Sequence, residues 1–308
     1  MEPGLKNWLR LILLGIIWGA SFMAVSVAVK TVGPLSVAAW RIGIGAVLLL
    51  ILIRIRQIPL PRIDADNGTT IWAFATGIGF LSMALPFFLL SWGQQHVASG
   101  FAGITMATVP ILVLPLAHFL VPGEIMSRAK LVGVFLGLTG VAILIGPDAF
   151  QSLGGRLEPI ARLACFGAAA CYAFGSITTR LAPKVDPMAF ATAATVMGAL
   201  MIIPLAISIE GLAPLTDRNA LIAIVFLGAI PTALANLLLV AIIRSAGPSF
   251  MSLVNYQVPL WSVLFGAVFL HELLPTRTFA ALALIMVGVG YSQQATLRRL
   301  LGRSVDRA

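Results

Sequence analysis

The sequence predicts an all-α integral membrane protein with ten transmembrane helices, arranged as two inverted five-helix repeats. Of the 308 residues, 59% are hydrophobic and only 10% are charged, whereas an average soluble domain is about 25% charged. Segments such as 46–53 and 131–145 are apolar on every side, which excludes the alternating strands of a membrane β-barrel. With two cysteines the chain also lacks the composition of a disulfide scaffold.

Ten apolar segments remain when the chain is divided at charged, proline and glycine-rich positions. Each approaches or exceeds the roughly 20 residues that a helix needs to cross a bilayer core. The predicted spans are 7–29, 34–54, 69–93, 98–121, 128–146, 157–180, 186–209, 217–243, 248–270 and 275–296.

The formal net charge of +9 follows the predicted topology. Fourteen of the twenty Lys and Arg residues fall in segments on the N-terminal side, five fall on the opposite side, and Arg41 lies within the second span. Cytoplasmic loops carry such an excess of basic residues. We therefore expect a multi-pass protein of the cell (inner) membrane with both termini in the cytoplasm, and the basic charge does not indicate a nucleic-acid partner.

Short motifs recur in the two halves of the chain in the same order. Ala84-Leu85-Pro86 in the third span recurs as Ala229-Ile230-Pro231 in the eighth, and the fourth and ninth spans each carry a proline and end at a glutamate. We predict a first repeat over 1–146, a second over 147–297, and a basic cytoplasmic tail over 298–308. Five spans per repeat invert the second repeat, an arrangement common in secondary transporters.

Several of these segments together resemble a known family. The first span carries Trp18-Gly19-Ala20-Ser21-Phe22, the second carries Arg41 followed by Ala46, and Leu136-Gly137-Leu138-Thr139-Gly140-Val141 lies in the fifth. With the segment from Pro110 to Glu124, the chain resembles the drug/metabolite transporter superfamily in its ten-helix EamA-type branch. The resemblance implies an exporter of small metabolites, often amino acids and including aromatic amino acids. The chain departs from the family pattern at two points. Ala281 stands where the tenth helix of the family usually has a glycine, and the seventh span has no counterpart of Arg41.

Prolines inside the paired spans are the candidate hinges. A proline in a helix leaves the carbonyl four residues earlier without its hydrogen bond, and such carbonyls at membrane depth are tolerated where they line a cavity. The hinge candidates are Pro86, Pro110, Pro231 and Pro259. Any one of them could instead serve only to kink its helix for packing.

Polar side chains at helical spacing predict which faces point away from lipid. Lipid would leave an amide such as that of Asn255 unsatisfied, so its helix face should point inward. The candidate substrate-binding residues are Trp18, Ser21, Arg41, Thr105, Thr108, Tyr172, Ser176, Asn236, Ser252, Asn255 and Tyr256. Two alternatives stay open: hydroxyl groups in a span often cap backbone groups, and Arg41 could extend outward to the membrane surface instead of binding a substrate carboxylate.

The ionisable residues within the spans limit the possible mechanisms. No Asp or Glu lies in the middle third of a span, so a carboxylate proton relay is not visible. The sequence shows no metal site and no cofactor motif, and His271-Glu272 lacks the second histidine of a zinc protease motif. We therefore predict no enzyme but a secondary transporter that exports small zwitterionic metabolites, foremost amino acids with aromatic ones among the candidates, by alternating access. The alternatives are a channel-like facilitator or an exporter of other small metabolites or drugs; oligomeric state and coupling stay open.

Overall fold

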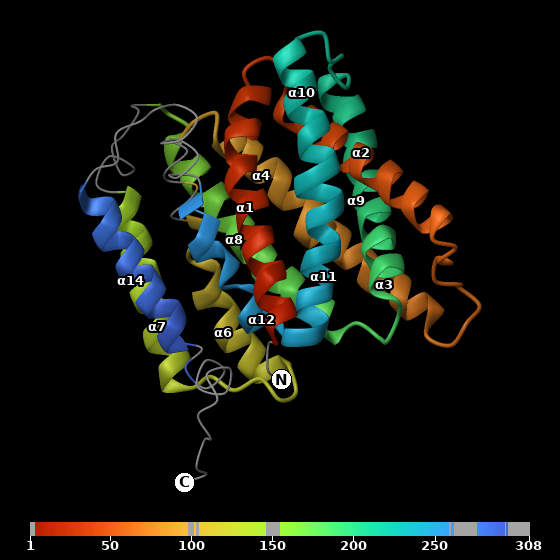
Figure 1. Ribbon diagram of the computed structural model, residues 1–308. Coiled ribbons are helices and arrows are strands. Elements are labelled where there is room, and N and C mark those ends of the chain that lie inside the picture. The colour runs from red at the N-terminus through yellow and green to blue at the C-terminus, as the bar shows by residue number, and fades with distance from the viewer. Residues whose placement is uncertain are drawn as a thin grey trace.

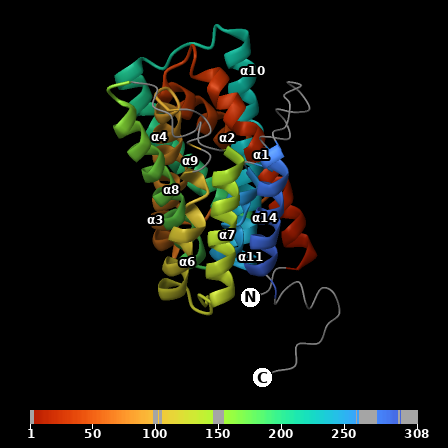
Figure 2. The ribbon, with the colours of Figure 1, turned by 90° about the vertical axis from the view of Figure 1, so that its left-hand side faces the viewer.

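A computed structural model describes residues 4–97, 102, 105–145, 155–258, 260–261, 276–292 and 294. Throughout these residues the regular structure is helical, without strands. The helices run side by side in one bundle (Figure 1), and a view turned by 90° shows the same side-by-side arrangement (Figure 2). The prediction of an all-helical membrane protein is confirmed.

Six helical segments are long and apolar enough to cross a membrane. Four are continuous α-helices: α1 (Leu5–Ala28), α2 (Pro34–Ile55), α8 (Glu158–Leu181) and α9 (Pro187–Glu210). Two are composite and contain a π-helical segment. The first joins α3 (Gly68–Gly79), η1 (Phe80–Ala84) and α4 (Leu85–Gly93); the second joins α10 (Arg218–Leu227), η3 (Gly228–Leu234) and α11 (Ala235–Ala246).

Four shorter helices complete the described fold: α6 (Val109–Leu120), α7 (Arg128–Ile145), α12 (Pro248–Met251) and α14 (Thr276–Ser292). They belong to the predicted spans 98–121, 128–146, 248–270 and 275–296, parts of which lie outside the described residues. The ten-helix count and the inverted repeats therefore stay predictions.

The bundle has two ends, which we name from Figure 1. The lower face is where α1 begins and α14 ends, and it also carries the connections 56–67, 121–127 and 182–186. The upper face carries the connections 29–33 and 211–217.

The two π-helical segments lie where the sequence repeats its alanine–proline motif. Pro86 is in the first turn of α4 directly after η1, and Pro231 is inside η3. Proline cannot donate a backbone hydrogen bond and its ring clashes with the preceding turn, and a widened π turn is one way for a helix to accommodate such a defect. In η3 the freed carbonyl of Leu227 is not exposed, because the Thr232 hydroxyl donates to it at 2.8 Å.

Two predicted spans are interrupted by turns, which the helical spacing did not foresee. Residues 107–108 form a turn before α6, and residues 252–253 form a turn after α12. Pro110 thus lies in the first turn of α6 rather than inside a longer helix, where its missing N–H leaves no bond unmade. The interrupted backbone changes the direction of every side chain that follows.

Close backbone contacts hold the helices in place. A Cβ atom added at Gly133 of α7 would lie 2.4 Å from the carbonyl oxygen of Gly288 in α14, so only glycines allow this pair to approach so closely. Elsewhere buried apolar side chains fill the spaces between α1, α2 and α10, between α2, α4 and α9, and between α4, α6 and α8.

A carboxylate connects distant segments at each face. On the upper face, the two Glu210 oxygens accept hydrogen bonds from the backbone N–H groups of Leu35 at 3.0 Å and Ser36 at 2.8 Å, a favourable place for a negative charge at a helix N-terminus. On the lower face, Glu124 pairs with Lys130 at 3.1 Å and packs against Gly247. Segments from the two halves of the chain therefore meet at both faces.

Candidate functional site

A narrow cavity lies inside the bundle between α1, α2, η1, α4, α6, α8, α11 and α12. The centres of water molecules can occupy about 70 Å³ of it. Since a cavity holds a water once it has about 10–15 Å³ of occupiable volume, this one is large enough for water or a small molecule. Its wall combines side chains from both halves of the chain.

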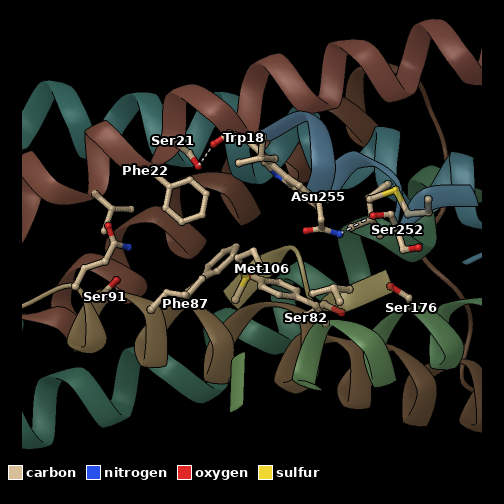
Figure 3. A pocket seen from close by; sticks show the side chains of 18 of the residues that line it. Trp18, Ser21, Phe22, Ser82, Phe87, Ser91, Met106, Ser176, Ser252 and Asn255 are labelled. Carbon is tan, nitrogen blue, oxygen red and sulfur yellow. Dashed lines mark hydrogen bonds between the residues drawn. The ribbon is translucent and has the colours of Figure 1, made fainter. Parts of the chain in front are cut away.

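Seven of the eleven predicted substrate-binding residues line this cavity. They come from α1, α2, α8 and the segment that follows α12, and they are Trp18, Ser21, Arg41, Tyr172, Ser176, Ser252 and Asn255. Ser91 lies at one end of the view in Figure 3 and Ser252 and Ser176 at the other, with Phe22, Phe87 and Met106 between them. Ser21, Ser82 and Asn255 also lie between these ends, so polar groups occur along the whole wall.

The other four predicted residues lie outside the cavity wall, and two of them bridge helices. Asn236 donates from Nδ2 to the Ala191 carbonyl at 3.0 Å and to Thr195 Oγ1 at 2.9 Å, which ties α11 to α9. Tyr256 is fully buried and donates its hydroxyl to the Val134 carbonyl of α7 at 3.0 Å. Tyr256 does not share the face of Ser252 and Asn255, because the turn at 252–253 breaks the helical register.

The two threonines of the fourth predicted span also lie outside the cavity wall. The Thr108 hydroxyl donates to the Thr105 carbonyl at 2.6 Å across the turn. Thr105 itself is completely buried. Both lie next to the cavity-lining Met106 and Val109 without contributing to the wall.

The three candidate hinges in the described residues, Pro86, Pro110 and Pro231, are buried and are not among the lining residues. Phe87 and Val109, next to Pro86 and Pro110, line the cavity, whereas neither neighbour of Pro231 does. Pro259 lies outside the described residues.

Arg41 is the charged group of the cavity wall. Its side chain is only 6% exposed, so the guanidinium points into the bundle and does not extend to the membrane surface. Nε donates to Thr232 Oγ1 at 3.3 Å, and the guanidinium carbon lies 3.7 Å from the ring centroid of Phe87. A Cβ atom at Gly45 would lie 2.8 Å from the Thr232 methyl group, so the glycine lets α2 approach η3 closely enough for this contact.

The Arg41 charge has no carboxylate partner within ion-pair distance among the described residues. Its two terminal nitrogens likewise donate to no described residue. A cation inside a membrane protein is expensive and is expected to face a partner or an aqueous cavity. The side of the guanidinium away from Thr232 therefore faces the cavity without a described partner.

Sequence reasoning missed one polar face of the cavity, on α4. Phe87, Ser91 and Gln94 all line it and are spaced i, i+4 and i+7, which places them on one side of a helix. The same spacing was readable in the sequence, but polar residues at the end of a span usually mark its exit from the membrane. The described residues hold no cluster of His, Cys, Asp or Glu that could bind a metal.

Comparison with known proteins identifies the architecture. The EamA-like transporter family matches residues 7–146 and again 159–292. An uncharacterized transporter of Archaeoglobus fulgidus is 29% identical over 92% of this chain and 98% of its own length. The uncharacterized inner membrane transporter YedA of Escherichia coli is 26% identical over 90% and 87%. A solved crystal structure shares the fold, with a TM-score of 0.77 and 20% identity over 95% of this chain and 99% of that one.

The two family matches together span nearly all of the described helices, and the curated relatives align over most of their own length. This multi-pass membrane protein therefore belongs to the EamA-like transporter family, and it is a transporter rather than an enzyme.

Proposed function

We propose that the protein exports small zwitterionic metabolites, foremost amino acids, from the cytoplasm by alternating access. The observation that carries the proposal is the buried guanidinium of Arg41, which faces the cavity without a described carboxylate partner. A planar guanidinium can bind a carboxylate through two parallel hydrogen bonds. A substrate carboxylate would supply the negative charge that the cavity wall lacks.

The size of the cavity favours small substrates. The space for water centres is only about 70 Å³, which favours a small amino acid such as alanine or serine. An aromatic amino acid would require Phe22, Phe87 or Met106 to move. We therefore expect small amino acids to bind more tightly than aromatic ones.

Alternating access is supported by where the helices are interrupted. The π segments and the turns at 107–108 and 252–253 flank the cavity on both halves of the chain. Irregular backbone of this kind is typical of transporter helices that form a substrate site. In the proposal the two inverted halves tilt about these points, and both termini lie in the cytoplasm of a cell (inner) membrane, as the excess of basic residues on the lower face favours.

A transport assay with purified protein tests the proposal. Proteoliposomes loaded with single radiolabelled amino acids, or with acids and amines of similar size, would be assayed for efflux. We expect saturable efflux of small amino acids, and at least about a tenfold loss of apparent affinity in Arg41→Gln, because a charge-assisted hydrogen bond is worth about 1.5–3 kcal/mol. Arg54→Gln is the matched control, since Arg54 is on the same helix but exposed.

Equal efflux of every compound, independent of a carboxylate, would contradict amino-acid export and favour a channel-like facilitator or an exporter of other metabolites. Repeating the efflux with an imposed pH gradient separates proton coupling from downhill movement. Labelling of single cysteines introduced at Lys6 and at Arg218, near opposite faces, tests the orientation.

A further inference from the structure

We propose that the cavity recognises the ammonium group of its substrate through two neutral oxygen atoms, Ser91 Oγ and Gln94 Oε1, beside the carboxylate site at Arg41. The proposal rests on the function proposed above and specifies it. The recognised class is the α-amino acid, whose two charged groups are carried by one carbon atom.

Both oxygen atoms are buried and unpaired. The Ser91 side chain is 1% exposed, and neither its Oγ nor Gln94 Oε1 has a hydrogen-bond partner among the described residues. Both residues line the cavity, and Figure 3 shows the Ser91 side chain at one end of it. Buried polar atoms are nearly always paired in folded proteins, so two unpaired oxygens on one cavity wall indicate that a ligand supplies the missing donors.

Their position next to Arg41 follows from the helix. The guanidinium carbon of Arg41 lies 3.7 Å from the Phe87 ring centroid, and Phe87, Ser91 and Gln94 share one face of α4. A rise of about 1.5 Å per residue places Ser91 about 6 Å along the axis from Phe87. In the proposal one α-amino acid spans this part of the cavity, with its carboxylate at the guanidinium and its ammonium at the serine hydroxyl, each through hydrogen bonds of about 2.9 Å.

The charges of the wall select for a zwitterion. An ammonium group offers three donors, which can be shared between the hydroxyl and the amide oxygen. No described carboxylate lines the cavity, so a neutral oxygen must accept from the ammonium, and among the lining residues Ser91 Oγ and Gln94 Oε1 are the buried oxygens that lack a partner. A carboxylic acid without an amine would leave both oxygens unpaired, and an amine without a carboxylate would be repelled by Arg41.

A comparison of two ligands of nearly the same size tests this selection. Binding of L-alanine and of propionate, which lacks the ammonium group, would be measured by equilibrium dialysis with the purified full-length protein. The test variant is the double substitution Ser91→Ala with Gln94→Met. The matched control is Ser26→Ala with Gln95→Met, because Ser26 is partly exposed, Gln95 is exposed, and both lie outside the cavity wall.

We expect the wild type to bind L-alanine at least about tenfold more tightly than propionate. The double variant should lose this difference by binding L-alanine more weakly while its affinity for propionate stays within about twofold. The control variant should behave as the wild type. Gln94→Asn, which keeps an amide, should retain part of the preference and serves as a second variant where the double variant does not fold.

Each contrary result has one meaning. Unchanged L-alanine binding in the double variant, or equal affinity of the wild type for both ligands, would overturn the ammonium site while leaving amino-acid transport intact. A wild type that binds neither L-alanine nor propionate, nor any other amino acid, would overturn the proposed function itself.

Discussion

The two composite spans, α3–η1–α4 and α10–η3–α11, share a backbone plan but differ in what their polar side chains do. Each contains a π segment at an alanine–proline motif. Five residues after the motif proline the first has Ser91 and the second has Asn236. Ser91 Oγ is unpaired at the cavity, whereas Asn236 is bonded twice to α9.

The same contrast holds one residue after the proline. Phe87 turns its ring to Arg41 at the cavity wall, whereas Thr232 uses its hydroxyl to pair the Leu227 carbonyl and to accept from Arg41 Nε. The second span therefore pairs its own polar groups and supports the cavity wall through the contact of Thr232 with Arg41. The first leaves its polar groups open to a ligand. Four experiments test this division between a supporting span and a binding span.

Thr232→Val should have the largest effect on stability. It removes the side-chain hydrogen bond to the Leu227 carbonyl and leaves Arg41 Nε without its acceptor. We expect the free energy of unfolding to fall by about 1–3 kcal/mol, the cost of a buried unpaired group, measured by SDS titration in mixed micelles. Thr232→Ser keeps the hydroxyl and should restore most of it; equal loss in both variants would show that the methyl group matters instead.

Asn236→Leu should have the next largest effect on stability. Two hydrogen bonds to α9 are lost, and at about 1 kcal/mol each the same titration should show a loss of about 1–2 kcal/mol. Substrate affinity of the folded protein should be unchanged, because Asn236 does not line the cavity. A loss of substrate affinity without a loss of stability would instead show that Asn236 contributes to substrate binding.

The contact between Arg41 and Phe87 should contribute less. A double-mutant cycle of Arg41→Gln and Phe87→Leu isolates it from the loss of packing volume. We expect a coupling energy of about 1 kcal/mol in stability, typical of a desolvated cation–π contact. Purely additive effects would mean that the ring only fills space.

Ser91→Ala should change stability least. Because its hydroxyl makes no bond to a described residue, the free energy of unfolding should change by less than about 0.5 kcal/mol, the lower end of a typical hydrogen bond. The same variant should bind L-alanine more weakly. Asn236→Leu and Ser91→Ala thus form a pair with opposite readouts, and a destabilised Ser91→Ala protein would remove the distinction between the two spans.

Sequence reasoning found the helical membrane fold, the family and seven residues of the cavity wall, because apolar length and polar residues within apolar spans are local signals. It could not separate Ser91 from Asn236. Both are small polar residues inside a span, and only the neighbouring helix decides whether a partner is present. Arg41 was likewise placed at membrane depth by the sequence, but its direction depends on the close approach of α2 to η3 at Gly45.

The amino-acid sequence by itself determined that this chain is helical and membrane-embedded, since a bilayer accepts only backbones that pair their own hydrogen bonds and the spans carry almost no charge. The tertiary structure alone decided which polar groups remain unpaired. Turns at 107–108 and 252–253 redirect side chains that an unbroken helix would align, and contacts such as Asn236 with α9 use groups that the spacing assigned to the cavity. Pairing in a packed interior depends on distances between helices, which no local pattern contains.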